Sequence, residues 1–166
     1  MKNFVLCLAI AVSCLAFSPE KADAKGWGGM YVSAGAAAQA LSVTAAKFTG
    51  FVTALPSSSA NGDTSVVSVI ASDHITLAPG HYLIRFDYAG TADATTLVTF
   101  TLRNGATAIT GASTRLNHPA ATTVATSMSF IFNPTAAATL SVYAVSASGT
   151  PSITASDCQI VVCRLD

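Results

Sequence analysis

The side chains that could carry chemistry in this sequence are few and widely spaced. Beyond residue 24 there are three histidines, and every acidic residue is an aspartate. A metal site requires two or three such ligands to converge, and the spacing of His74, His81 and His118 does not force them together. The sequence also lacks the Gly-x-Ser-x-Gly, phosphate-loop and dinucleotide motifs. We therefore expect no metal, no cofactor and no enzymatic activity.

The two cysteines beyond residue 24, Cys158 and Cys163, lie in one apolar segment near the end of the sequence. If this segment is a strand, the two thiols point to opposite faces, with Cα atoms about 17 Å apart. A disulfide requires less than about 7 Å, so the two cannot bond to each other. Two interpretations stay open: small buried residues, or bridges between subunits outside the cytoplasm.

Composition excludes one large class of partners. Charged residues make up only 10% of the chain and the net charge is zero. Soluble domains usually contain roughly 25% charged residues. A chain without basic excess lacks the electrostatic term that drives nucleic-acid binding, so we expect no nucleic-acid partner. Low charge also suits a surface that is partly covered by self-association.

The first 24 residues have the pattern of a secretory signal. Lys2 precedes an apolar run over residues 4–17, and Ala22-Asp23-Ala24 offers small residues at the two positions that a signal peptidase reads. The run is too short for a stable membrane span, which needs about 20 residues. We expect cleavage after Ala24 and a secreted or cell-surface protein.

The central part of the chain, residues 77–103, predicts two half-buried antiparallel strands. Apolar side chains recur at every second position from Tyr82 to Tyr88 and again from Val98 to Leu102. Because side chains alternate between the faces of a strand, one face of each is apolar. Asn104-Gly105 then suits the turn of a tight hairpin.

Similar patterns continue along the chain and predict an all-β fold. Eight to ten strands with frequent turn signals indicate one antiparallel two-sheet jelly-roll sandwich over residues 47–166. Alternation places Tyr143 on the side opposite Leu140, where it could contact a ligand such as a glycan. The further expected strands are residues 47–55, 66–71, 74–77, 107–116, 122–132, 140–146 and 158–165.

Residues 25–46 are rich in glycine and alanine. They are expected to form a flexible arm that leads into the first strand, or an arm that docks on a neighbouring subunit by adding a strand to its sheet. The bulky side chains available for such docking are Trp27, Met30, Tyr31 and Val32.

The last strand is apolar on both faces, unlike the others. One face would meet the core, and a second subunit is the simplest partner for the other. The expected self-association interface comprises Cys158, Ile160, Val161, Val162, Cys163 and Leu165.

The segments around residues 77–86, 102–105 and 139–142, with the apolar last strand, resemble the trimeric jelly-roll family of tumour necrosis factor and the globular head of the first complement component. Related heads occur in bacterial surface proteins and in phage fibre or decoration proteins. The resemblance covers roughly residues 47–165, without the Phe-x-Gly signature of many complement-type heads or a collagen-like stalk. It implies a ten-strand sandwich whose terminal strands face a three-fold axis.

We therefore expect a secreted, non-enzymatic jelly-roll protein that self-associates as a homotrimer and serves as an extracellular structural or adhesive module. Its partner is itself, with a cell-surface glycan or a capsid as further possibilities. Three alternatives stay open: a capsid-decoration or fibre-head protein of a phage virion, a subunit of an extracellular filament joined by N-terminal strand donation, and a carbohydrate-binding module.

Overall fold

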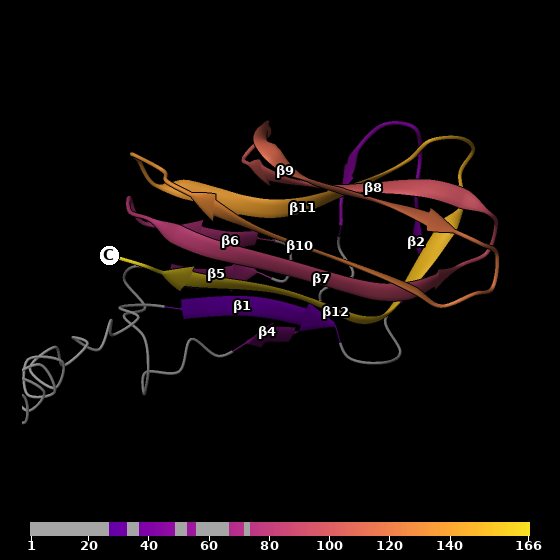
Figure 1. Cartoon of the computed structure of the whole chain (residues 1–166), viewed down its shortest axis with the longest axis horizontal. Helices are drawn as coiled ribbons and strands as arrows, with labels where there is room; N and C mark the ends of the chain where they lie inside the picture. Colours follow the sequence, from indigo (N-terminus) through magenta and orange to yellow (C-terminus); the bar gives the residue numbers. More distant parts are fainter. Residues whose placement is uncertain (1–26, 33–36, 49–52, 56–66, 72–73) are drawn as a thin grey trace, which may run out of the picture.

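The computed structural model describes residues 27–32, 37–48, 53–55, 67–71 and 74–166 (Figure 1). These residues form two antiparallel sheets of six strands each. The expected signal segment, residues 1–24, lies outside the described residues. No helix in the described part of the chain is long and apolar enough to cross a membrane.

The two sheets, here called sheet A and sheet B, face each other as the layers of a sandwich (Figure 1). Sheet A has the order β10 (Val124–Phe132), β7 (Tyr82–Ala92), β12 (Ser152–Arg164), β1 (Trp27–Val32) and β4 (Thr53–Leu55), with β2 (Gln39–Ala40) also paired to β12. Sheet B has the order β5 (Val67–Ala71), β6 (His74–Leu77), β11 (Ala138–Ser146), β8 (Thr96–Asn104) and β9 (Thr107–His118), with β3 (Ala46–Lys47) also paired to β11.

The core lies between the sheets and follows the alternation in the sequence. Tyr82 and every second residue up to Tyr88 point inward from β7 and are at most 1% exposed. Phe100 of β8 meets them from the opposite sheet, with its ring centroid 4.6 Å from that of Tyr88 and 5.3 Å from that of Phe86. Phe48 completes this aromatic cluster, 5.9 Å from Phe100. Such ring pairs add to the stabilisation that burial alone provides.

The hairpin predicted at Asn104-Gly105 is confirmed. Asn104 pairs with Thr107, so Gly105 and Ala106 form the turn between β8 and β9. Gly105 has a φ of 58°. This left-handed conformation costs an L-residue roughly 1–2 kcal/mol, which explains the glycine.

The all-β jelly-roll sandwich is confirmed, with some differences in the strands. Six strands, β7 to β12, are long, with 9 to 13 residues each, and the others in the described regions have 2 to 6 residues. The single strand expected over residues 47–55 is instead divided between β3 in sheet B and β4 in sheet A. Phe48 follows β3 directly and is buried in the core. Burial of this ring favours the end of β3 at Lys47.

The segment expected to be an arm contributes strands to the chain's own sandwich. β1 pairs antiparallel with β12 over six residues, from Trp27 opposite Cys163 to Val32 opposite Cys158. β2 pairs with the start of β12. The folded unit therefore includes residues before the boundary placed at residue 47. Glycines at positions 28 and 29 weaken the strand signal, because glycine has no side chain to pack and a high entropy cost.

Candidate functional site

The outer face of sheet A is the surface on which exposed apolar side chains gather. Antiparallel partners lie on the same face of a sheet, so the register defines rows across the strands. Ile131 of β10 is opposite Leu83 of β7, and Leu83 is opposite Cys163 of β12. Leu165 follows on the same side, held in line by its backbone N–H, which donates to the carbonyl of His81 (2.8 Å). We call Ile131, Leu83, Cys163 and Leu165 the apolar row.

The apolar row is unusually exposed for side chains of this size. Ile131 is 55% exposed, Leu165 53% and Leu83 41%. Among the described residues, these are three of the five large hydrophobic side chains that are exposed. Scattered exposed apolar residues are ordinary, but a contiguous group on one face marks an interaction surface. The backbone register continues the row to Trp27 of β1.

The next rows of the same face are polar and bound to one another. Asp87 accepts a hydrogen bond from Arg85 Nε (2.8 Å) and another from Gln159 Nε2 (3.0 Å). Beyond them, small residues of β7 and β10, including Ala89 and Ala125, leave a shallow hollow of about 310 Å³. The face therefore changes from apolar at one end to polar at the other.

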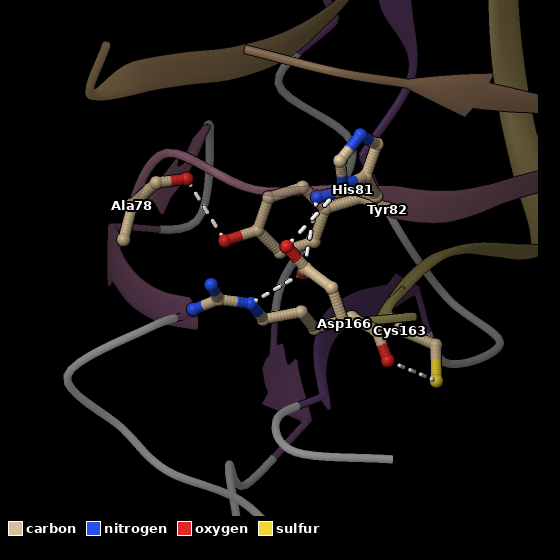
Figure 2. Close-up of polar contacts among 6 residues, drawn as sticks. Ala78, His81, Tyr82, Cys163 and Asp166 are labelled. Atoms are coloured by element: carbon tan, nitrogen blue, oxygen red, sulfur yellow. Dashed lines mark hydrogen bonds and ion pairs between the residues drawn. The ribbon is translucent and has the colours of Figure 1, made fainter. Parts of the chain in front are cut away.

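A polar cluster beside the apolar row ties the turn before β7 to the end of β12 (Figure 2). Asp166 Oδ1 accepts from Arg164 Nε (2.7 Å) and from the backbone N–H of His81 (3.1 Å). The other carboxylate oxygen lies 3.2 Å from His81 Nδ1. The hydrogen bond from Arg164 is the main reason that the pKa of Asp166 is well below its usual range. A Cβ on Gly80 would lie only 3.0 Å from Arg164 Nε, so glycine suits this close approach.

The His81–Asp166 pair has the residue types of a catalytic dyad, and its hydrogen bonds join the turn before β7 to the residues after β12. A dyad activates a nucleophile that contacts the histidine. The thiol nearest along β12, Cys163, instead donates to the carbonyl of Arg164 (3.7 Å), away from the imidazole (Figure 2). In the part of the chain that the structure describes, no group of three His, Cys, Asp or Glu residues could hold a metal ion. The hydrogen bonds of Asp166 to His81 and Arg164 hold the turn before β7 against the end of β12.

The structure divides the six residues expected at the interface between two faces of β12. Cys158, Ile160 and Val162 are 0% exposed and point into the core, so a second subunit cannot reach them in this fold. Val161, Cys163 and Leu165 point outward and are partly or largely exposed. A β-bulge between Ala155 and Asp157 adds one extra residue to β12. After this bulge the even-numbered residues of the strand, from Cys158 on, face the core.

The two cysteines are both free and occupy different environments. Burial raises the pKa of the Cys158 thiol, because the thiolate would lose its hydration inside the core. Cys163 lies in the apolar row and is partly exposed. Of the two, only Cys163 is accessible to a neighbouring subunit.

Tyr143, expected to contact a ligand, lies on the outer face of sheet B. The guanidinium of Arg103 stacks over its ring, 4.4 Å from the centroid. This cation–π contact covers one face of the ring, which a sugar would otherwise use. The residues expected to dock as an arm, Trp27, Met30, Tyr31 and Val32, belong to β1, whose backbone pairs with β12 and β4 of the same chain.

Sequence reasoning missed Leu83 and Ile131. Both occupy the outward positions of an alternating strand, where most neighbours are polar. On that face Leu83 lies between His81 and Arg85, and Ile131 comes two residues after Ser129. A large apolar residue in the outward phase was the available signal, because alternation predicts that such a residue is exposed.

Comparison with solved structures gives the fold class. Similar structures include Eiger TNF from S. frugiperda (TM-score 0.58, 12% identity, 86% of this chain and 94% of that chain). The globular domain of zebrafish complement 1qA protein is similar over 86% of this chain and 98% of that chain (TM-score 0.56, 13% identity). Murine APRIL is similar over 84% of this chain and 99% of that chain (TM-score 0.54, 10% identity).

The chain thus has the jelly-roll fold of tumour necrosis factor and complement globular heads, as the sequence resemblance indicated. At this level of identity the likeness concerns the fold. No family profile matches the sequence, and no curated protein matches it significantly.

Proposed function

We propose that the protein is a secreted, non-enzymatic jelly-roll module that self-associates as a homotrimer through the outer face of sheet A. The observation that carries the proposal is the apolar row, in which Leu83, Ile131 and Leu165 expose large side chains on one face. Covering such side chains is favourable by about 25 cal/mol per Å² of apolar surface. A second copy of the chain, which carries the same apolar row, is the partner that we propose for it.

Two further observations support this assignment. The trimeric jelly-roll heads that the sequence resembles place their terminal strands at a three-fold axis, and β12 with β1 lies in the sheet that carries the apolar row. The long strands β7 to β12 are joined by short connections, and only 10% of the residues in the sequence are charged. These features suit a structural or adhesive module outside the cell.

The filament alternative receives less support than the trimer. Donation of the segment around β1 to the next copy would require β1 to leave its place beside β12, where it pairs over six residues. Figure 1 shows the two strands side by side, although they come from opposite ends of the sequence.

The test is the molar mass of residues 25–166 in solution by light scattering, for the wild type and for Leu83→Lys. We expect a mass of three chains for the wild type and a mass of one chain for Leu83→Lys, because a buried lysine without a partner is costly. The matched control is Leu97→Lys, since Leu97 is 37% exposed on β8 in the other sheet. A monomeric wild type, or equal dissociation of both variants, would contradict the proposal.

Secretion has its own test. Protein recovered from the culture medium should begin at Lys25, as shown by N-terminal sequencing or intact mass. Recovery of the full chain from Met1 in the medium, or of all the protein from the cytoplasm, would contradict this part of the proposal.

A further inference from the structure

The strongest unexplained feature is a buried histidine that bridges the two sheets. His118 ends β9 in sheet B and is 0% exposed. Its Nε2 lies 3.3 Å from the hydroxyl of Tyr88, which belongs to β7 in sheet A. The two rings meet edge to face, with centroids 6.1 Å apart. Neither the core alternation nor the proposed trimer face requires a histidine here.

The surroundings of His118 contain no charge that could accompany a protonated imidazole. The titratable neighbours are Tyr88 and, beside it on β12, Cys158, and burial raises the pKa of both, so they are uncharged at neutral pH. On β8 the residue opposite His118 is Thr96, whose hydroxyl is hydrogen-bonded to that of Ser146 (2.7 Å).

The other elements near His118 do not supply a counter-ion either. β10 and residues 119–123 contain no titratable side chain. Asp93, at the end of β7, is exposed, and its carboxylate accepts the backbone N–H of Ser152 (2.8 Å). Burial lowers the pKa of His118, and the backbone of Pro119 offsets this only in part. Nδ1 has no hydrogen-bond partner within the described chain.

The segment that follows His118 is held in a strained conformation. Residues 119–123 carry the chain from β9 in sheet B to β10 in sheet A, and we call them the crossover (Figure 1). Ala121 has a φ of 56°, which among the described residues is the single positive φ of a non-glycine residue. Such conformations persist only where neighbouring contacts hold them. Here Ala121 N–H donates to the carbonyl of Ala92 (2.8 Å), and Ala120 N–H donates to Thr95 Oγ1 (3.2 Å).

We propose that His118 is an acid-responsive latch. The neutral imidazole holds the end of β9 against Tyr88 and keeps the strained crossover closed. The protonated imidazole leaves this uncharged interior for water, which releases the crossover and separates the edges of β9 and β10. The contacts that would be lost between these edges include the hydrogen bond between the hydroxyls of Thr114 and Thr126 (2.8 Å). The latch is independent of self-association.

The direction of the pH effect follows from where the proton binds better. The open state has a histidine of ordinary affinity, with a pKa of about 6.5, whereas the closed state binds the proton less well. Closure is therefore complete above about pH 6.5 and weakens as the pH falls below it. The opening equilibrium constant should rise by up to tenfold for each pH unit, because one proton is taken up on opening.

The test is hydrogen exchange of the whole mature protein between pH 7.5 and pH 5, corrected for intrinsic rates. In the wild type, protection of the amides of β9 and β10 should fall by up to tenfold per pH unit below about pH 6.5. Protection in the paired centre of β7 and β12 should stay constant. His118→Gln, which cannot be protonated, should remove the dependence, and the control His81→Gln should retain it. Unchanged protection in the wild type, or a dependence that survives in His118→Gln, would overturn the latch.

A second measurement covers the case in which His118→Gln does not fold. The imidazole C–H resonances of His118 in the wild type should titrate below about pH 6.5, where β9 protection is already falling, because the closed state binds the proton less well. A ring that titrates while protection stays constant would equally overturn the proposal.

Discussion

Leu83 of β7 and Ile131 of β10 are direct cross-strand partners on the outer face of sheet A, and they are 41% and 55% exposed. Cross-strand neighbours normally stabilise a sheet by covering each other. Here the pair leaves apolar surface in water, where the proposed second copy of the chain would cover it. This pair distinguishes the apolar end of the outer face of sheet A from the polar row around Asp87 on the same face.

Truncation of either member of this pair should weaken the proposed homotrimer. Burial of a leucine or isoleucine side chain is worth about 1.5–3 kcal/mol, so Leu83→Ala and Ile131→Ala should each raise the dissociation constant by roughly one to two orders of magnitude. Sedimentation equilibrium over a range of concentrations measures this directly. The control Leu97→Ala should leave the constant unchanged, and an equal effect of all three variants would argue for general loss of stability.

The two cysteines should differ in reactivity. Burial raises the pKa of Cys158, so its thiol should resist iodoacetamide at pH 8 until the protein unfolds. Cys163 should react in the folded monomer produced by Leu83→Lys and react more slowly in the assembled wild type. Peptide mass spectrometry after timed labelling separates the two sites. Rapid labelling of Cys158 in folded protein would show that β12 is in the opposite phase.

Substitution of Gly90 should destabilise the fold strongly. A Cβ at this position would collide with the hydroxyl of Tyr88 and lie 2.5 Å from the carbonyl oxygen of Thr154. We expect Gly90→Ala to lower the free energy of unfolding by about 1–3 kcal/mol, as overpacking does in other cores, measured by urea denaturation. Gly105→Ala is the matched control. Its Cβ would meet nothing within 4 Å, but its φ is 58°, so the loss should be about 1–2 kcal/mol and arise from the backbone alone.

Asp166 should stabilise the protein in a pH-dependent way. Its pKa is lowered in the folded state, chiefly by the hydrogen bond from Arg164, so its contribution is present above about pH 3.9 and is lost as the pH falls through the folded value. Asp166→Asn should therefore lower the melting temperature at pH 7 and have little effect near pH 1. Asp157→Asn, on the exposed bulge, provides a control that should have little effect at either pH. A deficit for Asp166→Asn that is constant with pH would show that charge is not the cause.

The strands of the central region could be predicted because their alternation is regular. Tyr82 to Tyr88 and Val98 to Leu102 each keep apolar residues in one phase, and Asn104-Gly105 marks the turn. The sandwich and its core follow from these segments. β1 could not be predicted in the same way, because its glycines weaken local propensity and its place is fixed by pairing with β12, at the far end of the sequence.

The sequence predicts a strand near residues 158–165 but does not show which of its two faces meets the core. Apolar residues such as Ile160 and Val161 occupy both phases, so the pattern indicates two covered faces without saying which one meets the core. The latch residue His118 was visible only as one histidine among three. Its burial depends on the meeting of β9 with β7, which are neighbours in space and belong to different sheets.

The bulge in β12 changes which positions of the strand face the core. Before it, odd-numbered residues such as Ile153 and Ala155 face inward, and after it even-numbered residues such as Cys158 and Ile160 do so. Ser156 is the extra residue of the bulge, because Ala155 pairs with Gly90 and Asp157 pairs with the next residue, Ala89. Deletion of Ser156 would leave a regular strand in which Cys158 still faces the core, whereas deletion of Gln159 would turn the residues after it to the opposite face. Among functional variants, loss of one residue should therefore be found at Ser156 sooner than at positions further along β12, where it would move core residues into water.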